Sequence, residues 1–174
     1  MSINDGRIIV YTGDGKGKTT AALGTAWRTL GHGLRVCVIQ FLKGKGEYGE
    51  RLFGASLENL EWHVCGKGFV FNKDDVTADR EVAHLGYELA KEKILGDLFD
   101  LVILDEITYL PLYGFLEVNE IIQLLQAKPK RLSVILTGRN ADKELIEIAD
   151  TVTSMEVVKH AFNSGIKARK GIEF

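Results

Sequence analysis

The sequence has no long apolar run and no apolar leader, and these two absences exclude most membrane-bound and exported proteins. None of its 174 residues lie in a stretch that approaches the roughly 18 apolar residues needed to span a bilayer. The first six residues are polar and lack the apolar core of a signal peptide. We therefore expect a cytoplasmic protein that does not act at a membrane.

The sequence also lacks an excess of either charge. Lysine and arginine total 22 against 24 aspartate and glutamate residues, which gives a net charge of −2. Proteins that bind nucleic acid generally carry a basic excess, so this balance argues against a nucleic-acid partner. It leaves room for one small anionic ligand held by a few local cations.

Cysteine is scarce, and no histidine pairs with a nucleophile at a telling spacing. Cys37 and Cys65 each lie in an apolar run, so we expect two buried, reduced thiols rather than a disulfide or a metal site. No cluster of cysteine and histidine in the sequence suggests zinc. The four histidines are scattered, and each is expected to be structural or on the surface.

What is present is an alternation of short apolar runs and longer helical patterns. Strands are predicted at residues 7–11, 36–41, 62–65, 101–104, 132–137 and 151–158. Helices are predicted at residues 18–30, 77–95, 118–127 and 141–149, with a short helix from the end of a loop at residues 43–49 to about residue 57. We expect Thr77 or Asp79 to cap the long helix at residues 77–95.

The predicted strands are continuously apolar rather than alternating, which is typical of parallel strands covered on both faces. No repeat, low-complexity tract or linker divides the chain. The prediction is therefore an α/β fold: a single doubly wound, mostly parallel sheet with helices on both faces, in one domain of residues 1–174.

A glycine-rich run between the first predicted strand and the first predicted helix has the order of a phosphate-binding loop. It consists of Gly13, Asp14, Gly15, Lys16, Gly17, Lys18, Thr19 and Thr20. Glycines let the backbone aim N–H groups at phosphate oxygens, and the start of the following helix adds its positive dipole end. Lys18 is expected to reach the outer phosphates of ATP, and the Thr19 hydroxyl to bind Mg²⁺ or Mn²⁺.

This loop is one residue shorter than the usual pattern, which places four residues between its two glycines. Counting back from Gly17 by that rule reaches Thr12, and only Asp14, Gly15 and Lys16 separate Gly13 from Gly17. An incidental glycine-rich turn is the alternative, but two lysines and two threonines directly before a helix disfavour it. The short loop suggests that the triphosphate is not held in the ordinary way.

Charged side chains follow two further predicted strands. Asp105 and Glu106 come directly after residues 101–104, and both are candidate metal ligands because buried carboxylates need a cation. If that strand continues, they project to opposite sides, so that one binds metal directly and the other through water. Arg139 follows residues 132–137, at a strand end where parallel sheets bind ligands, and could hold the outer phosphates. A solvated strand end and a surface arginine are the alternatives.

Several segments in the same order resemble the P-loop type of ATP:corrinoid adenosyltransferase. They lie at residues 12–22, 38–44, 104–109, 137–139, 149–152 and 158–162, and the resemblance extends from about residue 6 to residue 174. In this family the Co(I) centre of a reduced corrinoid attacks the ribose 5′ carbon of ATP, and triphosphate leaves whole. The resemblance implies an enzyme that needs no general base, since Co(I) is already a strong nucleophile.

On the nucleotide side, the resemblance implies that the loop holds the triphosphate, with Lys18 and Arg139 as the residues that act in catalysis. It places Thr19 and Glu106 on the metal, and it makes Arg28, on the helix after the loop, a further nucleotide contact.

On the corrinoid side, the resemblance implies that Phe69 and Phe71 lie against the lower face of the ring. Loss of the lower axial ligand leaves four-coordinate Co(II), which is easier to reduce. Some relatives have tryptophan at the second position, and packing of both rings into the core is the alternative. Only residues 1–6 precede the first predicted strand, where some relatives carry a longer segment that helps to cover the corrinoid.

The resemblance further implies a homodimer and a flavoprotein-type reductant. Two other functions fit the same core from the residues alone: a small-molecule kinase, and an ATP-dependent switch that is not an enzyme. The reaction products discriminate among the three. Triphosphate indicates adenosyl transfer, ADP with a phosphorylated acceptor indicates a kinase, and slow release of ADP and phosphate indicates a switch.

Overall fold

The computed structural model describes residues 5–44, 46, 48–66 and 76–173 of the chain. Within these residues the strands form one six-stranded sheet in the order β3-β2-β4-β5-β1-β6, and every neighbouring pair is parallel. The strands are β1 (Ile8–Thr12), β2 (Val36–Phe41), β3 (Leu60–Cys65), β4 (Leu101–Asp105), β5 (Ser133–Thr137) and β6 (Thr151–Ser154).

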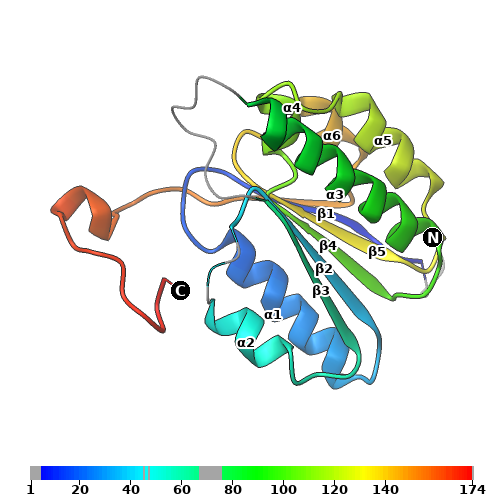
Figure 1. The fold of residues 1–174 in the computed structure, drawn as a ribbon, viewed down its shortest axis with the longest axis horizontal. Coiled ribbons are helices and arrows are strands. Elements are labelled where there is room, and N and C mark those ends of the chain that lie inside the picture. The colour runs from blue at the N-terminus through cyan, green and yellow to red at the C-terminus, as the bar shows by residue number, and fades with distance from the viewer. Residues whose placement is uncertain (1–4, 45, 47, 67–75, 174) are drawn as a thin grey trace.

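Helices cover both faces of the sheet, as Figure 1 shows. One face carries α1 (Lys18–Gly31) and α2 (Gly49–Gly54). The other carries α3 (Thr77–Leu95), α4 (Tyr109–Leu112), α5 (Val118–Ala127) and α6 (Lys143–Ile148). The predicted doubly wound α/β fold is therefore confirmed. Among the described residues, no helix is both long and apolar enough to cross a lipid bilayer.

Two apolar layers explain why the strands are apolar along their whole length. Successive residues of a strand point to opposite faces, so both sets must be covered. In β4, Val102 and Leu104 pack into the layer beneath α3 and α5. Leu101 and Ile103 pack into the opposite layer, beneath α1. All four side chains are almost completely buried.

Three details of the sequence prediction are wrong. Neither Thr77 nor Asp79 occupies the cap position of α3, because the helix begins one residue earlier than a cap at Thr77 would allow and Val76 takes that position without a side-chain cap. The last strand stops at Ser154 instead of residue 158, where the chain leaves the sheet and Val158 is 96% exposed. Cys37 is buried as expected, but Cys65 is only half-buried; both thiols are free.

The sheet order gathers the site at one edge. Strand β5 lies between β1 and β4, and β4 pairs with β2 on its other side. Because all strands are parallel, their carboxyl ends meet at the same edge, where doubly wound folds bind ligands. The C-terminal segment leaves β6 and extends away from the body of the molecule before its end returns toward the start of α1 (Figure 1).

Candidate nucleotide site

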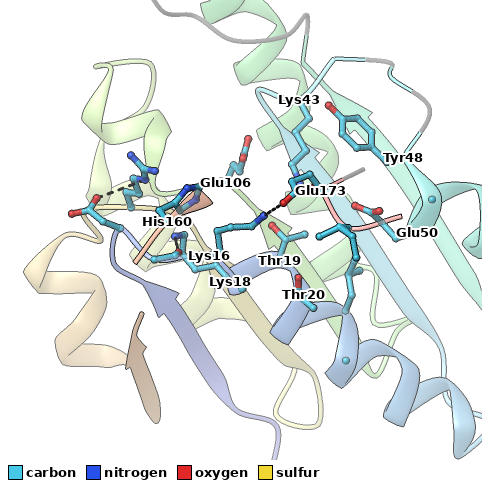
Figure 2. Close-up of a pocket in the computed structure, with 18 of the residues that line it drawn as sticks. Lys16, Lys18, Thr19, Thr20, Lys43, Tyr48, Glu50, Glu106, His160 and Glu173 are labelled. Atoms are coloured by element: carbon cyan, nitrogen blue, oxygen red, sulfur yellow. Dashed lines mark hydrogen bonds and ion pairs between the residues drawn. The ribbon is translucent and has the colours of Figure 1, made fainter. Parts of the chain in front are cut away.

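A cavity of about 830 Å³ opens at this edge of the sheet. Figure 2 shows that the side chains around it come from the glycine loop, from the ends of several strands and from the C-terminal segment. Its charged and hydroxyl-bearing lining residues include Asp14, Lys16, Lys18, Thr19, Thr20, Lys43, Tyr48, Glu50, Glu106, Tyr109, Arg139, His160 and Glu173. The predicted loop, Glu106 and Arg139 are thus brought together around one space.

The loop takes a conformation that requires glycine at its two ends. Gly13 has φ 90° and Gly17 has φ 110°, values that a residue with a side chain rarely adopts. A Cβ on Gly13 would also lie 2.4 Å from the carbonyl oxygen of Met155. Met155, just after β6, holds the loop in place, because its carbonyl accepts a 2.7 Å hydrogen bond from the Gly15 N–H.

The start of α1 lies at the cavity, and no side chain of the helix offsets the partial positive charge of this helix end. Gly17 occupies the cap position, no side chain caps the helix, and no acidic residue lies in its first turn. The first N–H groups of a helix have no intrahelical partner, and the helix dipole places partial positive charge there. This end of α1 is therefore suited to binding an anion such as phosphate.

Lys18 points back onto the loop. Its ammonium donates hydrogen bonds of 2.6 Å to the carbonyl oxygens of both Gly13 and Gly15. Burial lowers the pKa of Lys18, and the nearby Arg139 guanidinium lowers it further. The ammonium is thus held at the mouth of the loop by neutral acceptors, which an anionic ligand can outcompete.

Asp105 is completely buried and is surrounded by donors. One carboxylate oxygen accepts hydrogen bonds from the Thr19 hydroxyl at 2.8 Å and the Thr137 hydroxyl at 2.6 Å. The other accepts from Gln40 at 2.9 Å and from the Lys43 ammonium at 2.8 Å. Burial alone would raise the pKa of Asp105, but the Lys43 ammonium and the hydrogen bonds from Thr137 and Gln40 together outweigh it, so the pKa lies below its usual value. Asp105 is therefore a fixed, ionised carboxylate.

Glu106, the next residue, lacks the hydrogen-bond donors that surround Asp105 among the described residues. The strand ends at Asp105, and Glu106 turns into the left-handed region with φ 67°. Its side chain lines the cavity, and no hydrogen bond joins it to another residue in the part of the chain that the structure describes. Burial raises the pKa of Glu106 to about 7. We expected the two carboxylates to project to opposite sides if the strand continued past Asp105. The strand ends at Asp105, so that condition is not met.

Two further cations lie near the loop. The Arg139 guanidinium lies 3.7 Å from the Asp14 carboxylate. The Lys16 ammonium lies 2.8 Å from the Glu173 carboxylate, so the end of the C-terminal segment reaches the loop (Figure 2). Both pairs are largely exposed, and exposed ion pairs contribute little to stability. Both cations can therefore exchange their partners for phosphate at low cost.

The structure supports no contact with this cavity for Arg28, and it does not describe two other predicted contact residues. Arg28 is exposed on α1 and does not line the cavity, whereas the preceding residue, Trp27, does. Phe69 and Phe71 lie outside the described residues. The proposed roles of these three residues remain predictions.

Lys43 and Thr137 are functional candidates that the sequence analysis missed. Both contact Asp105, and their role depends on contacts between neighbouring strands. One signal was available, because Lys43 follows strand β2 closely, as Glu106 follows β4 and Arg139 follows β5. The rule that placed the acidic residues at a strand end applies equally to this lysine.

A second group of polar side chains lies away from the cavity. The sulfur of Cys37 and the ligand-type atoms of Glu61 and His63 lie within 4.8 Å of one another. The Glu61 carboxylate is already neutralised by Lys93 at 3.0 Å and by Arg35 at 3.8 Å. We interpret this group as an ion-pair cluster centred on Glu61 of strand β3, with Cys37 on the neighbouring strand β2.

The parallel sheet, the glycine loop after β1 and the lysine and threonine at the start of α1 are consistent with the P-loop class of nucleotide-binding fold. Within that class the chain belongs to the family described as ATP:corrinoid adenosyltransferase BtuR/CobO/CobP, whose model matches residues 4–174. The resemblance inferred from the sequence segments is confirmed.

Relatives match over nearly the whole chain. The chain is 41% identical over 169 residues to the corrinoid adenosyltransferase of Escherichia coli strain K12, covering 97% of this chain and 86% of that protein. It is 42% identical to the corrinoid adenosyltransferase CobA of Salmonella typhimurium, with the same coverage. It is 43% identical over 175 residues to a corrinoid adenosyltransferase of Sinorhizobium sp., covering 97% of this chain and 80% of that protein.

Proposed function

We propose that this chain transfers the 5′-deoxyadenosyl group of ATP to the Co(I) centre of a reduced corrinoid. The observation that carries the proposal is the family match across residues 4–174, which includes the short glycine loop and the acidic strand end. The cavity supports it, because Lys16, Lys18 and Arg139 line the same space as the open start of α1. We further propose that residues 1–174 act as one nucleotide-binding domain.

The triphosphate binds at the glycine loop. Phosphate oxygens accept from the N–H groups at the start of α1, and the Lys18 ammonium exchanges the carbonyls of Gly13 and Gly15 for phosphate. Arg139, at the end of β5, approaches the outer phosphates from the side of Asp14. Lys16, also in the loop, adds a further cation at the exposed rim.

The residues present fit a Mg²⁺ or Mn²⁺ ion beside the triphosphate. These ions prefer oxygen ligands, and the Thr19 hydroxyl and the Glu106 carboxylate both face the cavity. The Thr19 hydroxyl donates a hydrogen bond to Asp105, so the lone pairs of its oxygen stay free for a cation. We therefore assign Glu106 as the direct carboxylate ligand and Asp105 as the residue that orients Thr19. When bound, the ion supplies positive charge that offsets that of the triphosphate.

The transfer is a displacement at carbon. The electron pair of Co(I) forms the cobalt–carbon bond to the ribose 5′ carbon, the bond from that carbon to oxygen breaks, and its electrons leave with triphosphate. No proton has to be removed, so this step needs no general base. Negative charge grows on the departing oxygen, so the role of Lys18 and Arg139 is to stabilise that charge.

The corrinoid side of the proposal rests on the family. Phe69 and Phe71 are assigned to the lower face of the ring by their match to the aromatic pair of the family. By the same reasoning we propose that the protein works as a homodimer and receives electrons from a flavoprotein-type reductant.

The test is anaerobic incubation of the protein with ATP, Mg²⁺ and chemically reduced corrinoid. We expect the absorption spectrum of Co(I) to be replaced by that of an alkylated corrinoid only when all components are present. A reaction without ATP serves as the control for spontaneous reoxidation. If the Co(I) spectrum decays at the same rate with and without the protein, adenosyl transfer is the wrong assignment.

A further inference from the structure

Lys43 is the cation that contacts the acidic strand end. It follows β2, its side chain is only 14% exposed, and its ammonium lies 2.8 Å from Asp105 Oδ2. The same ammonium lies 5.9 Å from the centre of the Tyr48 ring, whose face attracts cations. The Lys43 side chain also lines the cavity that we assign to the nucleotide (Figure 2).

The other cations around the cavity are engaged elsewhere. Lys18 bonds to loop carbonyls, Arg139 lies beside Asp14, and Lys16 pairs with Glu173. Burial would lower the pKa of Lys43, but the carboxylates of Asp105, Glu106 and Glu50 together outweigh burial and raise the pKa, so the ammonium stays charged. Among the described residues, Lys43 is thus the cation that contacts Asp105, and its charge also acts on the neighbouring Glu106 carboxylate.

We propose that Lys43 is an internal counter-ion that holds the cation position beside Asp105 and Glu106, so that divalent metal binds tightly only together with nucleotide. The proposal rests on the assignment of this cavity as the nucleotide site. An ammonium and a divalent ion so close together repel each other, and two carboxylates do not compensate three positive charges. The phosphates of the nucleotide bring the missing negative charge and further oxygen ligands, after which both cations are tolerated.

This makes Lys43 a positioning residue for the reaction. Metal that entered alone would bind Glu106 and leave the loop without its triphosphate, whereas metal that enters with ATP arrives already bound to the phosphates. Neutralising Lys43 removes the competing charge and frees Asp105 Oδ2. The acidic pair then forms a site that attracts a divalent ion without nucleotide.

The test is titration of the protein with Mn²⁺ in the absence of nucleotide, with free Mn²⁺ followed by electron paramagnetic resonance. We expect Lys43→Met and Lys43→Gln to bind Mn²⁺ roughly tenfold or more tightly than the wild type, the size expected for a charge-assisted contact. Lys43→Arg keeps the charge and should bind like the wild type. Lys91→Met, which removes an exposed lysine paired with Glu88 on α3, is the matched control and should change nothing.

Lys43→Gln is included because it can still donate a hydrogen bond to Asp105 and so preserves the fold better than methionine. The wild type gives a measurement that needs no variant: Mn²⁺ should bind much more tightly in the presence of a non-reactive ATP analogue than in its absence. Equal affinity in the two conditions would overturn the proposal, as would neutral Lys43 variants that bind Mn²⁺ no more tightly than the wild type.

The adenosylation assay separates this inference from the proposed function. A wild type that adenosylates corrinoid, together with Lys43 variants of unchanged Mn²⁺ affinity, removes the counter-ion role and leaves the function standing. Tighter Mn²⁺ binding by the variants, together with a wild type that does not adenosylate corrinoid, supports the counter-ion role and removes the function.

Discussion

At the scale of residues, the site depends on two adjacent carboxylates that are held in different states. Both Asp105 and Glu106 lie in largely buried positions at the end of β4. Asp105 accepts four hydrogen bonds, one of them from Lys43, and its pKa lies below the usual value. Glu106 has no comparable partner among the described residues, and burial raises its pKa to about 7. The first is a structural anion, and the second is available to a ligand.

This difference predicts an unusual dependence of stability on pH. In the folded protein Glu106 keeps its proton up to pH about 7, whereas the unfolded chain releases it near the ordinary value of 4.5. Between these values a rise in pH favours the unfolded chain, by up to about 3 kcal/mol. Glu106→Gln cannot ionise, so without metal or nucleotide it should be more stable than the wild type at pH 8 and equally stable below pH 4.5. Urea unfolding of both proteins across this range measures the difference, and a constant difference at every pH would contradict the account.

A second residue-scale prediction concerns Lys18. Lys18→Ala removes the ammonium that exchanges loop carbonyls for phosphate, so the affinity for MgATP should fall. Loss of a charge-assisted contact costs about 1.5–3 kcal/mol, or roughly a tenfold to hundredfold rise in Kd. Calorimetric titration measures this, with Lys91→Ala on the exposed face of α3 as the control. An unchanged affinity in Lys18→Ala would remove the phosphate loop from the proposed site.

Much of the site could be predicted from the sequence because its residues directly follow strands. The loop follows β1, Glu106 follows β4 and Arg139 follows β5, and all strands of a parallel sheet end at the same edge. What could not be predicted depends on contacts across strands. Thr137 and Lys43 meet at Asp105 only because β2, β4 and β5 are neighbours, and that order is a property of the folded sheet.

At the scale of elements, the glycine loop is stabilised by the chain that follows β6. The Met155 N–H donates to the Thr12 carbonyl at 2.9 Å, and the Met155 carbonyl accepts from Gly15. The short loop therefore packs against a second backbone segment as well as against its own helix. The predicted strand at residues 151–158 was too long because this segment turns from pairing with β1 to supporting the loop.

This packing predicts opposite effects of two glycine substitutions. Gly13→Ala combines φ 90° with a Cβ 2.4 Å from the Met155 oxygen, so it should lower the free energy of unfolding by about 1–3 kcal/mol and weaken ATP binding. Gly24→Ala lies in α1 with nothing within 4 Å of its Cβ, so it should raise stability by about 0.5–1 kcal/mol. Chemical unfolding without nucleotide measures both. Equal effects of the two variants would contradict the close packing of the loop.

Helix ends were harder to predict than helix positions. The start of α3 has a valine at the cap position. In the box that caps α5, Glu120 is a usual residue type, but Glu117 takes the cap position where serine, threonine, aspartate or asparagine is expected. The short helix α4 was not predicted because four residues give too little periodicity.

The role that we propose for Phe69 and Phe71 is the part of the function specific to corrinoid. If Phe71 displaces the lower ligand of Co(II), Phe71→Ala should slow adenosylation that starts from Co(II) with a biological reductant. It should affect far less the reaction of corrinoid already reduced to Co(I), and ATP affinity should stay near normal. The measurement compares both rates in wild type and variant. Equal losses in both assays with a large drop in thermal stability would favour a packing role instead.

At the scale of the whole molecule, the parallel sheet brings the proposed site residues together at one edge. The acidic pair, the loop and Arg139 surround a single cavity, and the C-terminal segment returns to it through the contact between Lys16 and Glu173. In this arrangement Lys16, Lys18 and Arg139 line the cavity beside the open end of α1. We propose that these groups hold a triphosphate that departs whole as the leaving group.

The identity of that leaving group is the most direct test. The wild-type protein is incubated anaerobically with ATP, Mg²⁺ and reduced corrinoid, and the phosphorus-containing products are identified by phosphorus NMR. The account predicts one intact triphosphate for each adenosylated corrinoid formed, and no triphosphate when corrinoid is omitted. ADP with a phosphorylated acceptor, or ADP and phosphate released without corrinoid, would contradict it.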